Sequence, residues 1–351
     1  MSIPQTAKQW TVTGTSGFDD LKFHEAPVPE LGDSQVLVKL HAASLNFRDL
    51  IIPQGKYPFA TKKNPIPGSD GAGEVIAVGK HVDRFQVGDK VVTVFSQGHI
   101  GGELDAQGAR TGLGGALDGT LRTVGAFDQQ GLVHMPKGLN YLEAASLPCA
   151  AVTAWNALYG LQGRALKPGQ WVLTQGTGGV SIFALQFAKA AGARVVATTS
   201  SSEKAKLLEK LGADHIINYK ENPEWGAEAR KLTGGEGVDH VIEVAGPTSM
   251  KQSLNSVKIE GVITIIGFVG GAVKGDKEPG FLDCLNHLCT TRGLLVGSRL
   301  QMEDMNRAIE ANLDKLRPVV DGKVFKLDQL KEAYEYQWSG KHQGKVCIQI
   351  S

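Results

Sequence analysis

The sequence predicts an α/β protein in which a β-rich, barrel-like domain is joined to a domain built on a parallel, doubly wound sheet. Residues 1–125 contain short apolar runs separated by glycine and proline, a pattern typical of many short strands. From Trp171 onward, strand and helix patterns alternate, which indicates a parallel sheet covered by helices. The length of 351 residues exceeds what one compact core usually holds, so two domains are expected.

The expected strands of the first domain lie between glycine-containing turns. Residues 36–42 alternate apolar and polar side chains, and residues 73–79 and 90–95 are short apolar runs. Glycines at the ends of these runs indicate turns. Residues 97–119 contain eight glycines and predict a loop rather than a helix or strand.

The second domain is expected over residues 155–295. A helical segment over 142–161 leads into it, and its first strand begins at Trp171. The later strands are predicted over residues 215–218, 238–244, 262–266 and 294–296. Beyond the sheet, the pattern predicts a helix over 302–313 and a terminal strand over 345–350.

A glycine-rich turn lies between the first strand and the first helix of this domain. Gly176 permits a tight turn after the strand, and Gly178 allows the backbone to approach a ligand closely. The helix that follows carries apolar side chains at helical spacing, so one of its faces must lie on a sheet. Its N-terminus offers N–H groups and a partial positive charge to an anion. Strand, turn and helix together predict a binding site for the pyrophosphate of a dinucleotide.

The end of the second strand indicates which dinucleotide binds. Sites for NAD usually carry an acid roughly 20 residues after the first glycine, where it binds the ribose 2′-hydroxyl. Here residues 198–201 all carry hydroxyl groups, Ser200 and Ser201 among them, and no acid precedes Glu203. Hydroxyl groups and the charge of Lys204 suit a 2′-phosphate, which a carboxylate would repel. The sequence therefore favours NADPH over NADH, although the serines also suit the cap of the following helix.

Composition and charge argue against several classes of function. The net charge of +1 provides no electrostatic basis for binding nucleic acid or an anionic membrane. No apolar run reaches the roughly 18 residues of a membrane span, and the polar N-terminus lacks the apolar core of a signal peptide. Four cysteines are too few for a disulfide scaffold. We therefore expect a reduced, cytoplasmic protein that acts on a small-molecule substrate.

Seven motifs follow one another along the chain. They are residues 45–49 (LNFRD), 55–58 (GKYP), 67–75 (PGSDGAGEV), 87–91 (VGDKV), 147–155 (LPCAAVTAW), 211–214 (LGAD) and 266–267 (IG). Their order and spacing resemble the medium-chain dehydrogenase/reductase superfamily, the alcohol dehydrogenase and quinone oxidoreductase relatives. The resemblance covers nearly the whole chain and implies a GroES-like β-barrel catalytic domain over 1–125, completed by about 298–351. It also implies a Rossmann NADP-binding domain over 155–295 and direct hydride transfer from the nicotinamide.

The chain departs from the zinc-dependent members of that superfamily at the metal ligands. Those members use a Cys in the first motif, a His in Gly-His-Glu and a later Cys. Here the first two positions are Asn46 and Ser69, and only Cys149 remains. A thiolate, an amide and a hydroxyl make a poor zinc site. The cysteines and histidine within 284–289 supply no alternative, because residue 289 points away from the other two on a helix, so no bound metal is expected.

The resemblance also implies which residues form the site. Asn46, at a former ligand position, and Tyr57, in the Gly-x-Tyr-Pro motif, are implied as hydrogen-bond or proton donors to the substrate. Each also suits a structural role, Asn46 as a turn-stabilising amide and Tyr57 as a rim aromatic. Arg48 and Asp49 are expected to form a structural ion pair or cap. Beyond the turn glycines, Ser200, Ser201 and Lys204, the implied cofactor contacts are Thr153, Gly179, Val180, Tyr219, Gly267, Phe268, Val269, Ser298 and Lys345, the last near the phosphates.

These observations predict a zinc-independent, NADPH-dependent oxidoreductase that transfers hydride to a carbonyl, a quinone or an activated double bond. Two alternatives are a zinc-dependent alcohol dehydrogenase with substitute ligands such as Asp70 or His41, and a non-catalytic NADPH-binding protein. The active cleft is expected between Asn46 and Tyr57 on one side and the turn at 267–269 on the other. Proteins that resemble this chain usually pair their cofactor domains, so a homodimer is expected.

Overall fold

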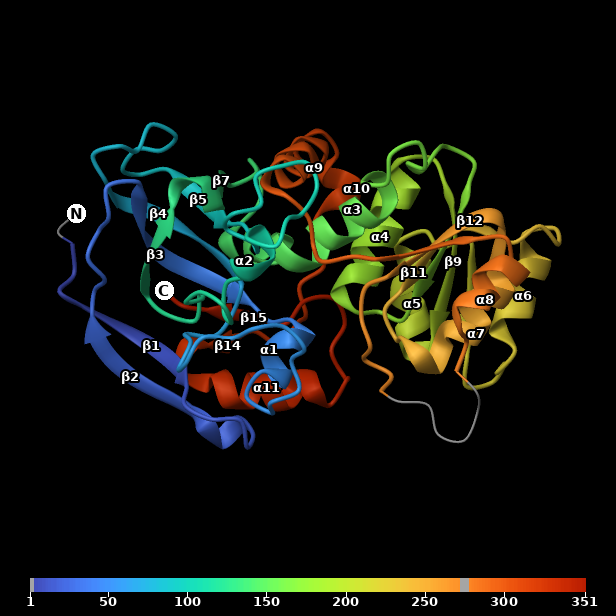
Figure 1. Ribbon diagram of the computed structural model, residues 1–351, viewed down its shortest axis with the longest axis horizontal. Coiled ribbons are helices and arrows are strands. Elements are labelled where there is room, and N and C mark those ends of the chain that lie inside the picture. Colours follow the sequence, from blue (N-terminus) through green and yellow to red (C-terminus); the bar gives the residue numbers. More distant parts are fainter. Residues whose placement is uncertain (1–2, 272–277) are drawn as a thin grey trace. The chain divides into compact units, whose positions relative to one another are not determined.

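The computed structural model describes residues 3–271 and 278–351, which form two compact units (Figure 1). One unit comprises Met1–Val152, Gly297–Leu313 and Arg317–Ser351, and the other comprises Thr153–Val296 and Asp314–Leu316. The first unit is therefore built from both ends of the chain, and most of the second is inserted between them. The predicted α/β class, with its parallel doubly wound sheet, is confirmed.

The first unit is built on a seven-stranded sheet in which most neighbours are antiparallel. In sheet order its strands are β14 (Phe325–Lys326), β15 (Cys347–Gln349), β3 (Gln35–Ser44), β4 (Asp70–Val78), β5 (Lys90–Thr93) and β7 (Leu132–His134), with β6 (Val124–Asp128) also paired to β3. The C-terminal strand β15 thus completes a sheet that the N-terminal strands begin. Separately, β1 (Thr6–Val12) and β2 (Leu21–Pro27) pair antiparallel.

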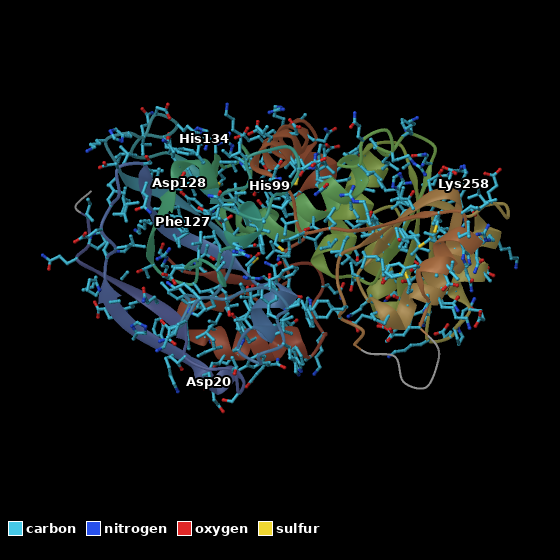
Figure 2. The ribbon with its side chains drawn as sticks, viewed as in Figure 1. Asp20, His99, Phe127, Asp128, His134 and Lys258 are labelled. Atoms are coloured by element: carbon cyan, nitrogen blue, oxygen red, sulfur yellow. The ribbon has the colours of Figure 1, made fainter. Side chains whose placement is uncertain are left out.

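The core of this unit follows the two-residue period of its strands. In β3, Val36, Val38 and Leu40 pack in one apolar cluster, which Phe127 of β6 also joins (Phe127 is labelled in Figure 2). Ala43, from the opposite set of β3 positions, packs in another cluster. Alternate side chains point to opposite faces of a strand, so β3 contributes to both clusters.

Short helices and loops connect these strands. In the described part of the chain, the α-helices of this unit are α1 (Phe47–Ile51), α2 (Tyr141–Ala145), α9 (Arg299–Ala311) and α11 (Leu330–Trp338), and a π-helical turn (Leu147–Ala151) follows α2. The helices α3 (Val152–Tyr159) and α10 (Leu313–Leu316) lie almost wholly in the second unit. The helical segment predicted over 142–161 is thus divided into three parts. Residues 97–119 form mainly loop, as predicted, with one 3₁₀ turn at Gly108–Arg110. None of the helices in the described part of the chain is long and apolar enough to span a membrane.

The second unit contains a six-stranded parallel sheet with helices on both faces (Figure 1). Its strands, in sheet order, are β10 (His215–Asn218), β9 (Arg194–Thr199), β8 (Trp171–Gln175), β11 (Val238–Glu243), β12 (Val257–Ile265) and β13 (Thr290–Gly293). The helices α4 (Gly179–Ala190) and α5 (Ser202–Lys210) cover one face, and α6 (Trp225–Leu232) and α7 (Pro247–Ser256) cover the other. The strand order reverses between β8 and β11, where ligands bind in such sheets.

The last strand of this sheet differs from the prediction. The apolar residues 294–296 were expected to form it, but the polar segment Thr290–Gly293 pairs with β12 instead. Val296 has a φ of 53°, a left-handed conformation that cannot continue a strand. Residues 294–296 therefore form a connection after the strand, of which only Val296 is buried, so an apolar run does not by itself mark a strand.

Candidate active site

The glycine-rich turn joins β8 to α4 at the point where the strand order reverses. Gly176 follows β8 with a φ of 75°, a left-handed conformation that favours glycine. Gly178 then caps the N-terminus of α4. A Cβ atom built on either glycine would meet no protein atom within 4 Å, so the turn is open where a ligand would approach. The amides of Gly179 and Val180 lie in the first helical turn, which favours a bound anion.

Ser181 stands where such turns usually carry a third glycine or an alanine. Its hydroxyl donates to the Gln175 carbonyl at 2.7 Å, and the side chain is buried. The extra polar group is therefore satisfied by the strand that precedes the turn, and the turn can keep its shape.

The residues expected to select the dinucleotide lie at the same edge of the sheet. The Tyr219 N–H donates to the carbonyl of Thr199, the last residue of β9, at 3.0 Å. Tyr219 and Ser200 therefore leave adjacent strands at the same level. The Ser201 hydroxyl accepts a hydrogen bond from the Lys204 N–H at 3.3 Å and caps α5. The capping interpretation of Ser201 is thus confirmed, and its contact with a phosphate stays a prediction.

The charge at this corner of the sheet is suited to an anion. Burial lowers the pKa of the Lys204 ammonium; nearby Glu203 opposes this shift, and the like charge of Lys220 adds to it. Two cations therefore influence the same region. An anionic ligand would be attracted by both positive charges.

A buried carboxylate that the sequence analysis did not identify organises the neighbouring strand end. Glu243 ends β11 and is fully buried. It accepts hydrogen bonds from Gln175 Nε2 (2.8 Å), Ser249 Oγ (2.6 Å), Ser253 Oγ, and the N–H groups of Ala245 (3.0 Å) and Gly246 (2.8 Å). These bonds hold the turn after β11 against the end of β8. An acid at the end of a buried apolar run is the sequence signal that could have identified it.

The turn after β12 presents apolar side chains near this network. The Val269 N–H donates to the Val244 carbonyl at 3.3 Å, and a Cβ on Gly267 would lie 2.9 Å from the same oxygen. Phe268 and Val269 are 43% and 51% exposed. The structure therefore places both side chains at the carboxyl edge of the sheet, where the sequence predicts the nicotinamide.

Two other predicted cofactor residues are almost fully buried. Thr153 lies near the start of α3, and Ser298 precedes α9 in the first unit. The Ser298 hydroxyl accepts a hydrogen bond from the Gln301 N–H at 3.2 Å and so caps α9. The cofactor roles of Thr153 and Ser298 stay predictions.

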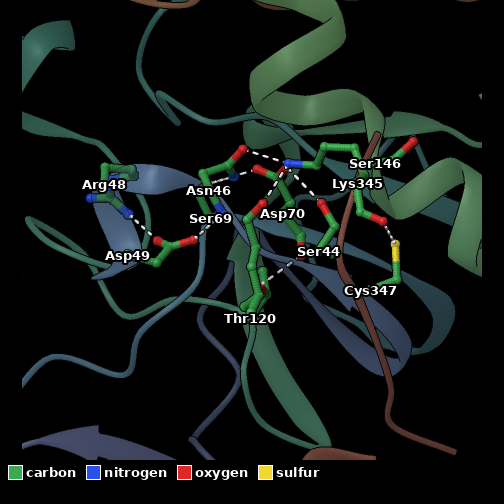
Figure 3. Close-up of polar contacts among 12 residues, drawn as sticks. Ser44, Asn46, Arg48, Asp49, Ser69, Asp70, Thr120, Ser146, Lys345 and Cys347 are labelled. Atoms are coloured by element: carbon green, nitrogen blue, oxygen red, sulfur yellow. Dashed lines mark hydrogen bonds and ion pairs between the residues drawn. The ribbon is translucent and has the colours of Figure 1, made fainter. Parts of the chain in front are cut away.

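Four side chains of the first unit form a closed ring of polar contacts (Figure 3). The Lys345 ammonium donates to Asn46 Oδ1 and forms an ion pair with Asp70, with 3.3 Å between Nζ and Oδ2. Asn46 Nδ2 donates to Ser69 Oγ at 3.3 Å. The Ser69 hydroxyl in turn donates to Asp70 Oδ1 at 2.7 Å. We call Lys345, Asn46, Ser69 and Asp70 the polar ring.

The strand register explains why these residues meet. β3 and β4 pair Ser44 with Asp70, and the Ser44 hydroxyl also donates to Asp70 Oδ2 at 3.0 Å. Asn46 comes after β3 and Leu45 and caps α1. Lys345 precedes β15, which pairs antiparallel with the same end of β3 and places Cys347 opposite Ser44. Residues far apart in the sequence are thus brought together at the ends of three neighbouring strands.

The donors at this place do not suit a zinc ion. The Lys345 ammonium would repel a divalent cation. Burial raises the pKa of the Cys149 thiol well above its usual range, with Asp70 adding to the shift and Lys345 opposing it. Zinc binds the thiolate, which this environment disfavours. His41, considered as a substitute ligand, stacks on Tyr141 at 4.4 Å. Among residues 3–271 and 278–351, no group of three His, Cys, Asp or Glu side chains is arranged to hold a metal.

Tyr57 lies in a group of aromatic and charged side chains of the same unit. The Arg48 guanidinium stacks on the Tyr57 ring at 4.9 Å and on the Phe95 ring at 5.1 Å. Arg48 also forms the expected ion pair with Asp49 at 3.1 Å. Asp49 accepts a hydrogen bond from the Asn46 N–H at 2.8 Å, so a chain of contacts connects the two predicted donors, Tyr57 and Asn46. Their catalytic roles stay predictions.

Both units match known protein families. Residues 32–137 match the family described as alcohol dehydrogenase GroES-like domain, and residues 179–311 match the family described as zinc-binding dehydrogenase. The matches cover β3 and β4, which carry part of the polar ring, and the helix after the glycine turn, whereas Lys345 and β15 lie outside them.

Similar proteins cover nearly the whole chain. The chain is 48% identical to a zinc-type alcohol dehydrogenase-like protein of Schizosaccharomyces pombe, over 95% of this chain and 96% of that protein. It is 31% identical to the 2-methylene-furan-3-one reductase of Solanum lycopersicum, over 99% of this chain and 80% of that protein. The solved structure of an NAD-dependent alcohol dehydrogenase shares 31% identity and a TM-score of 0.87, over 98% of this chain and 100% of that chain. The similar proteins thus include both dehydrogenases and a reductase.

Proposed function

Because the chain belongs to the medium-chain dehydrogenase/reductase superfamily, we propose that it is a zinc-independent, NADPH-dependent oxidoreductase. The observation that carries this proposal is the polar ring. At positions 46 and 69, which match metal-ligand positions of the zinc-dependent members, an amide and a hydroxyl are bonded to a buried Lys345–Asp70 ion pair. The positive charge beside these two positions is therefore the ammonium group of Lys345.

The two units would contribute different parts of the reaction. Bound NADPH supplies a hydride from its nicotinamide. The open turn at Gly176 and Gly178, with the first amides of α4, would bind the pyrophosphate. Asn46 Nδ2 would donate a hydrogen bond to the charge that develops on the substrate oxygen. The Tyr57 hydroxyl would supply a proton or a second hydrogen bond.

The substrate class we propose is a carbonyl, a quinone or an activated double bond. Similarity to a 2-methylene-furan-3-one reductase supports a conjugated ketone as one candidate. Similarity to alcohol dehydrogenases supports a simple carbonyl as another. Two other functions are tested alongside: zinc-dependent alcohol oxidation with substitute ligands, and NADPH binding without turnover.

The first experiment measures turnover and metal content together. The purified protein should oxidise NADPH with at least one member of a panel of aldehydes, ketones, quinones and enones, and a strong chelator should leave the rate unchanged. Elemental analysis should find well under one zinc per chain, because the ring offers a cation and no ligand set. Stoichiometric zinc whose removal abolishes turnover would establish the zinc-dependent alternative. Tight NADPH binding with no turnover across the panel would establish the binding protein.

The second experiment tests the choice of dinucleotide. NADPH should bind more tightly than NADH, and Lys204→Ala should weaken NADPH binding by about 1–3 kcal/mol, the range for a hydrogen bond to a charged group. The affinity for NADH should change little, since NADH lacks the 2′-phosphate. Lys210→Ala, at the other end of α5, is the matched control and should leave both affinities unchanged. Equal affinities of the wild-type protein for the two dinucleotides, measured by fluorescence titration, would refute the assignment.

We also propose that the second unit pairs with a second copy of the chain. β13 is one of the two edge strands of the parallel sheet, and edge strands have unpaired N–H and C=O groups. The preceding helix α8 (Phe281–Asn286) exposes apolar side chains: Phe281 is 100% exposed, Leu282 73% and Leu285 65%. Such a patch beside a free sheet edge is typical of an interface.

Light scattering tests this pairing. The wild-type protein should have the mass of a dimer, and Leu285→Glu should shift it to the monomer, because a charge would be buried in the interface. Val87→Glu, at an exposed apolar position of the first unit, should leave the dimer intact. A monomeric wild-type protein at micromolar concentration would contradict the proposal.

A further inference from the structure

The polar ring assigns a direction to the amide of Asn46. Lys345 Nζ donates to the Leu45 carbonyl at 2.8 Å, to Asn46 Oδ1 and to Asp70 Oδ2 at 3.3 Å, which accounts for all three ammonium protons. An ammonium group can only donate, so the atom of Asn46 that faces it must be the oxygen. The nitrogen of the same amide then faces Ser69 Oγ. The Lys345 ammonium therefore favours this orientation of Asn46, together with the Asp49 N–H, which donates to the Asn46 side chain in the capping box of α1.

Asn46 is also the member of the ring that is closest to the surface. It is 8% exposed, Lys345 is 3% exposed, and Ser69 and Asp70 are fully buried. Asn46 Nδ2 carries two protons, and the ring uses one of them, for Ser69. The second N–H is the group through which the ring can reach a substrate.

We propose that Lys345 is a positioning residue that holds Asn46 with its nitrogen, rather than its oxygen, available to the substrate. This inference rests on the proposed function, in which Asn46 donates to the substrate oxygen. A reversed amide would present a second oxygen to the developing negative charge and would oppose the reaction. The ammonium also polarises the amide through Oδ1, which strengthens its N–H as a donor.

This role differs from the phosphate contact expected for Lys345 from the sequence. A lysine side chain that is 4% exposed, with every ammonium proton donated inside the first unit, would have to leave its ion pair to reach a phosphate. The two roles predict different effects of replacing Lys345. A phosphate contact predicts weaker NADPH binding, and a positioning role predicts slower turnover at unchanged NADPH affinity.

The test removes both charges of the ion pair together. Lys345→Met alone would leave Asp70 buried without a counterion, so the variant of choice is the double substitution Lys345→Met/Asp70→Asn. It is compared with Asn46→Ala and with the triple variant that combines all three changes. Lys326→Met, an exposed lysine of the same terminal segment, is the matched control and should behave as the wild type.

The expected result has three parts. The double variant should lose at least about tenfold in kcat/KM for the carbonyl substrate, with the NADPH dissociation constant unchanged. Asn46→Ala should lose at least as much. In the triple variant the loss should equal that of Asn46→Ala alone, because Lys345 acts through Asn46 and has nothing left to position. If the ion pair were purely structural, its removal would instead lower activity to the same extent in the presence and in the absence of the Asn46 side chain.

A second readout does not depend on turnover. In protein labelled with ¹⁵N-asparagine, the side-chain amide signals of Asn46 are identified by their absence in Asn46→Ala. They should exchange slowly with solvent in the wild type and faster in the double variant, where the amide can rotate. Identical Asn46 signals in both proteins, full activity of the double variant, or multiplicative losses in the triple variant would each overturn the inference. A wild-type protein without turnover would refute the proposed function separately, and the amide signals would still decide the orientation of Asn46.

Discussion

Lys345→Met should lower the free energy of unfolding by about 3–5 kcal/mol, because removing one partner of a buried ion pair leaves the other charge uncompensated. The side chains of Lys345 and Asp70 are 4% and 0% exposed, so water cannot replace the lost ammonium. Urea denaturation followed by fluorescence measures the change as a shift of the first unit's transition. The same substitution also removes the hydrogen bonds to Leu45 and Asn46.

Adding Asp70→Asn should return most of this stability, since the double variant leaves neither charge of this ion pair buried without its partner. Lys326→Met should change the free energy of unfolding by no more than about 0.5 kcal/mol, as is usual for an exposed side chain. If Lys345→Met is as stable as the wild type, or if adding Asp70→Asn restores no stability, the Lys345–Asp70 ion pair is not what neutralises the buried charge at this site.

Tyr57→Phe should lower kcat on the best substrate by roughly 10²-fold or more, because the phenol is the proposed proton or hydrogen-bond donor. The substitution removes only the hydroxyl. The ring can keep its stacking with the Arg48 guanidinium, 4.9 Å from its centre, and its edge contact with Phe59. NADPH affinity should therefore stay unchanged. Stopped-flow single-turnover rates would separate the chemical step from product release.

Tyr336→Phe is the matched control, since the Tyr336 hydroxyl bonds to Asp321 at 3.1 Å and takes no part in the proposed reaction. It should leave kcat as it is. If kcat also survives in Tyr57→Phe, water or the substrate supplies the proton. The assignment of Tyr57 is then wrong, while the reductase proposal stands.

The parts of the fold that depend on nearby residues were predicted correctly. The α/β class and the strand–turn–helix unit at Gly176 were predicted, because apolar periodicity and turn glycines act over a few residues. The last strand of the parallel sheet was misplaced. Its pairing with β12 is a contact between distant segments, which the apolar character of residues 294–296 does not reveal.

In the candidate site, too, contacts between nearby residues were predicted and contacts between distant residues were not. The Ser201 cap and the Arg48–Asp49 ion pair join residues a few positions apart and were expected. The carboxylate of Glu243 was missed, because its partner Gln175 lies 68 residues away and its other partners follow it in a turn. The local pattern shows only an acid at the end of an apolar run, and its hydrogen bonds across the sheet form when two strands become neighbours.

The sequence by itself determined that this protein has a dinucleotide-type glycine turn and lacks two of the usual zinc ligands, since both are properties of residue identity and short spacing. Only the tertiary structure decided which side chains surround these two positions. Lys345 reaches Asn46 across 299 residues and Asp70 across 275, through strand pairing that brings β15 beside β3 and β4. From the sequence, Lys345 was expected near a phosphate. In the folded protein its side chain is buried and forms an ion pair with Asp70, because a buried charge needs a counterion.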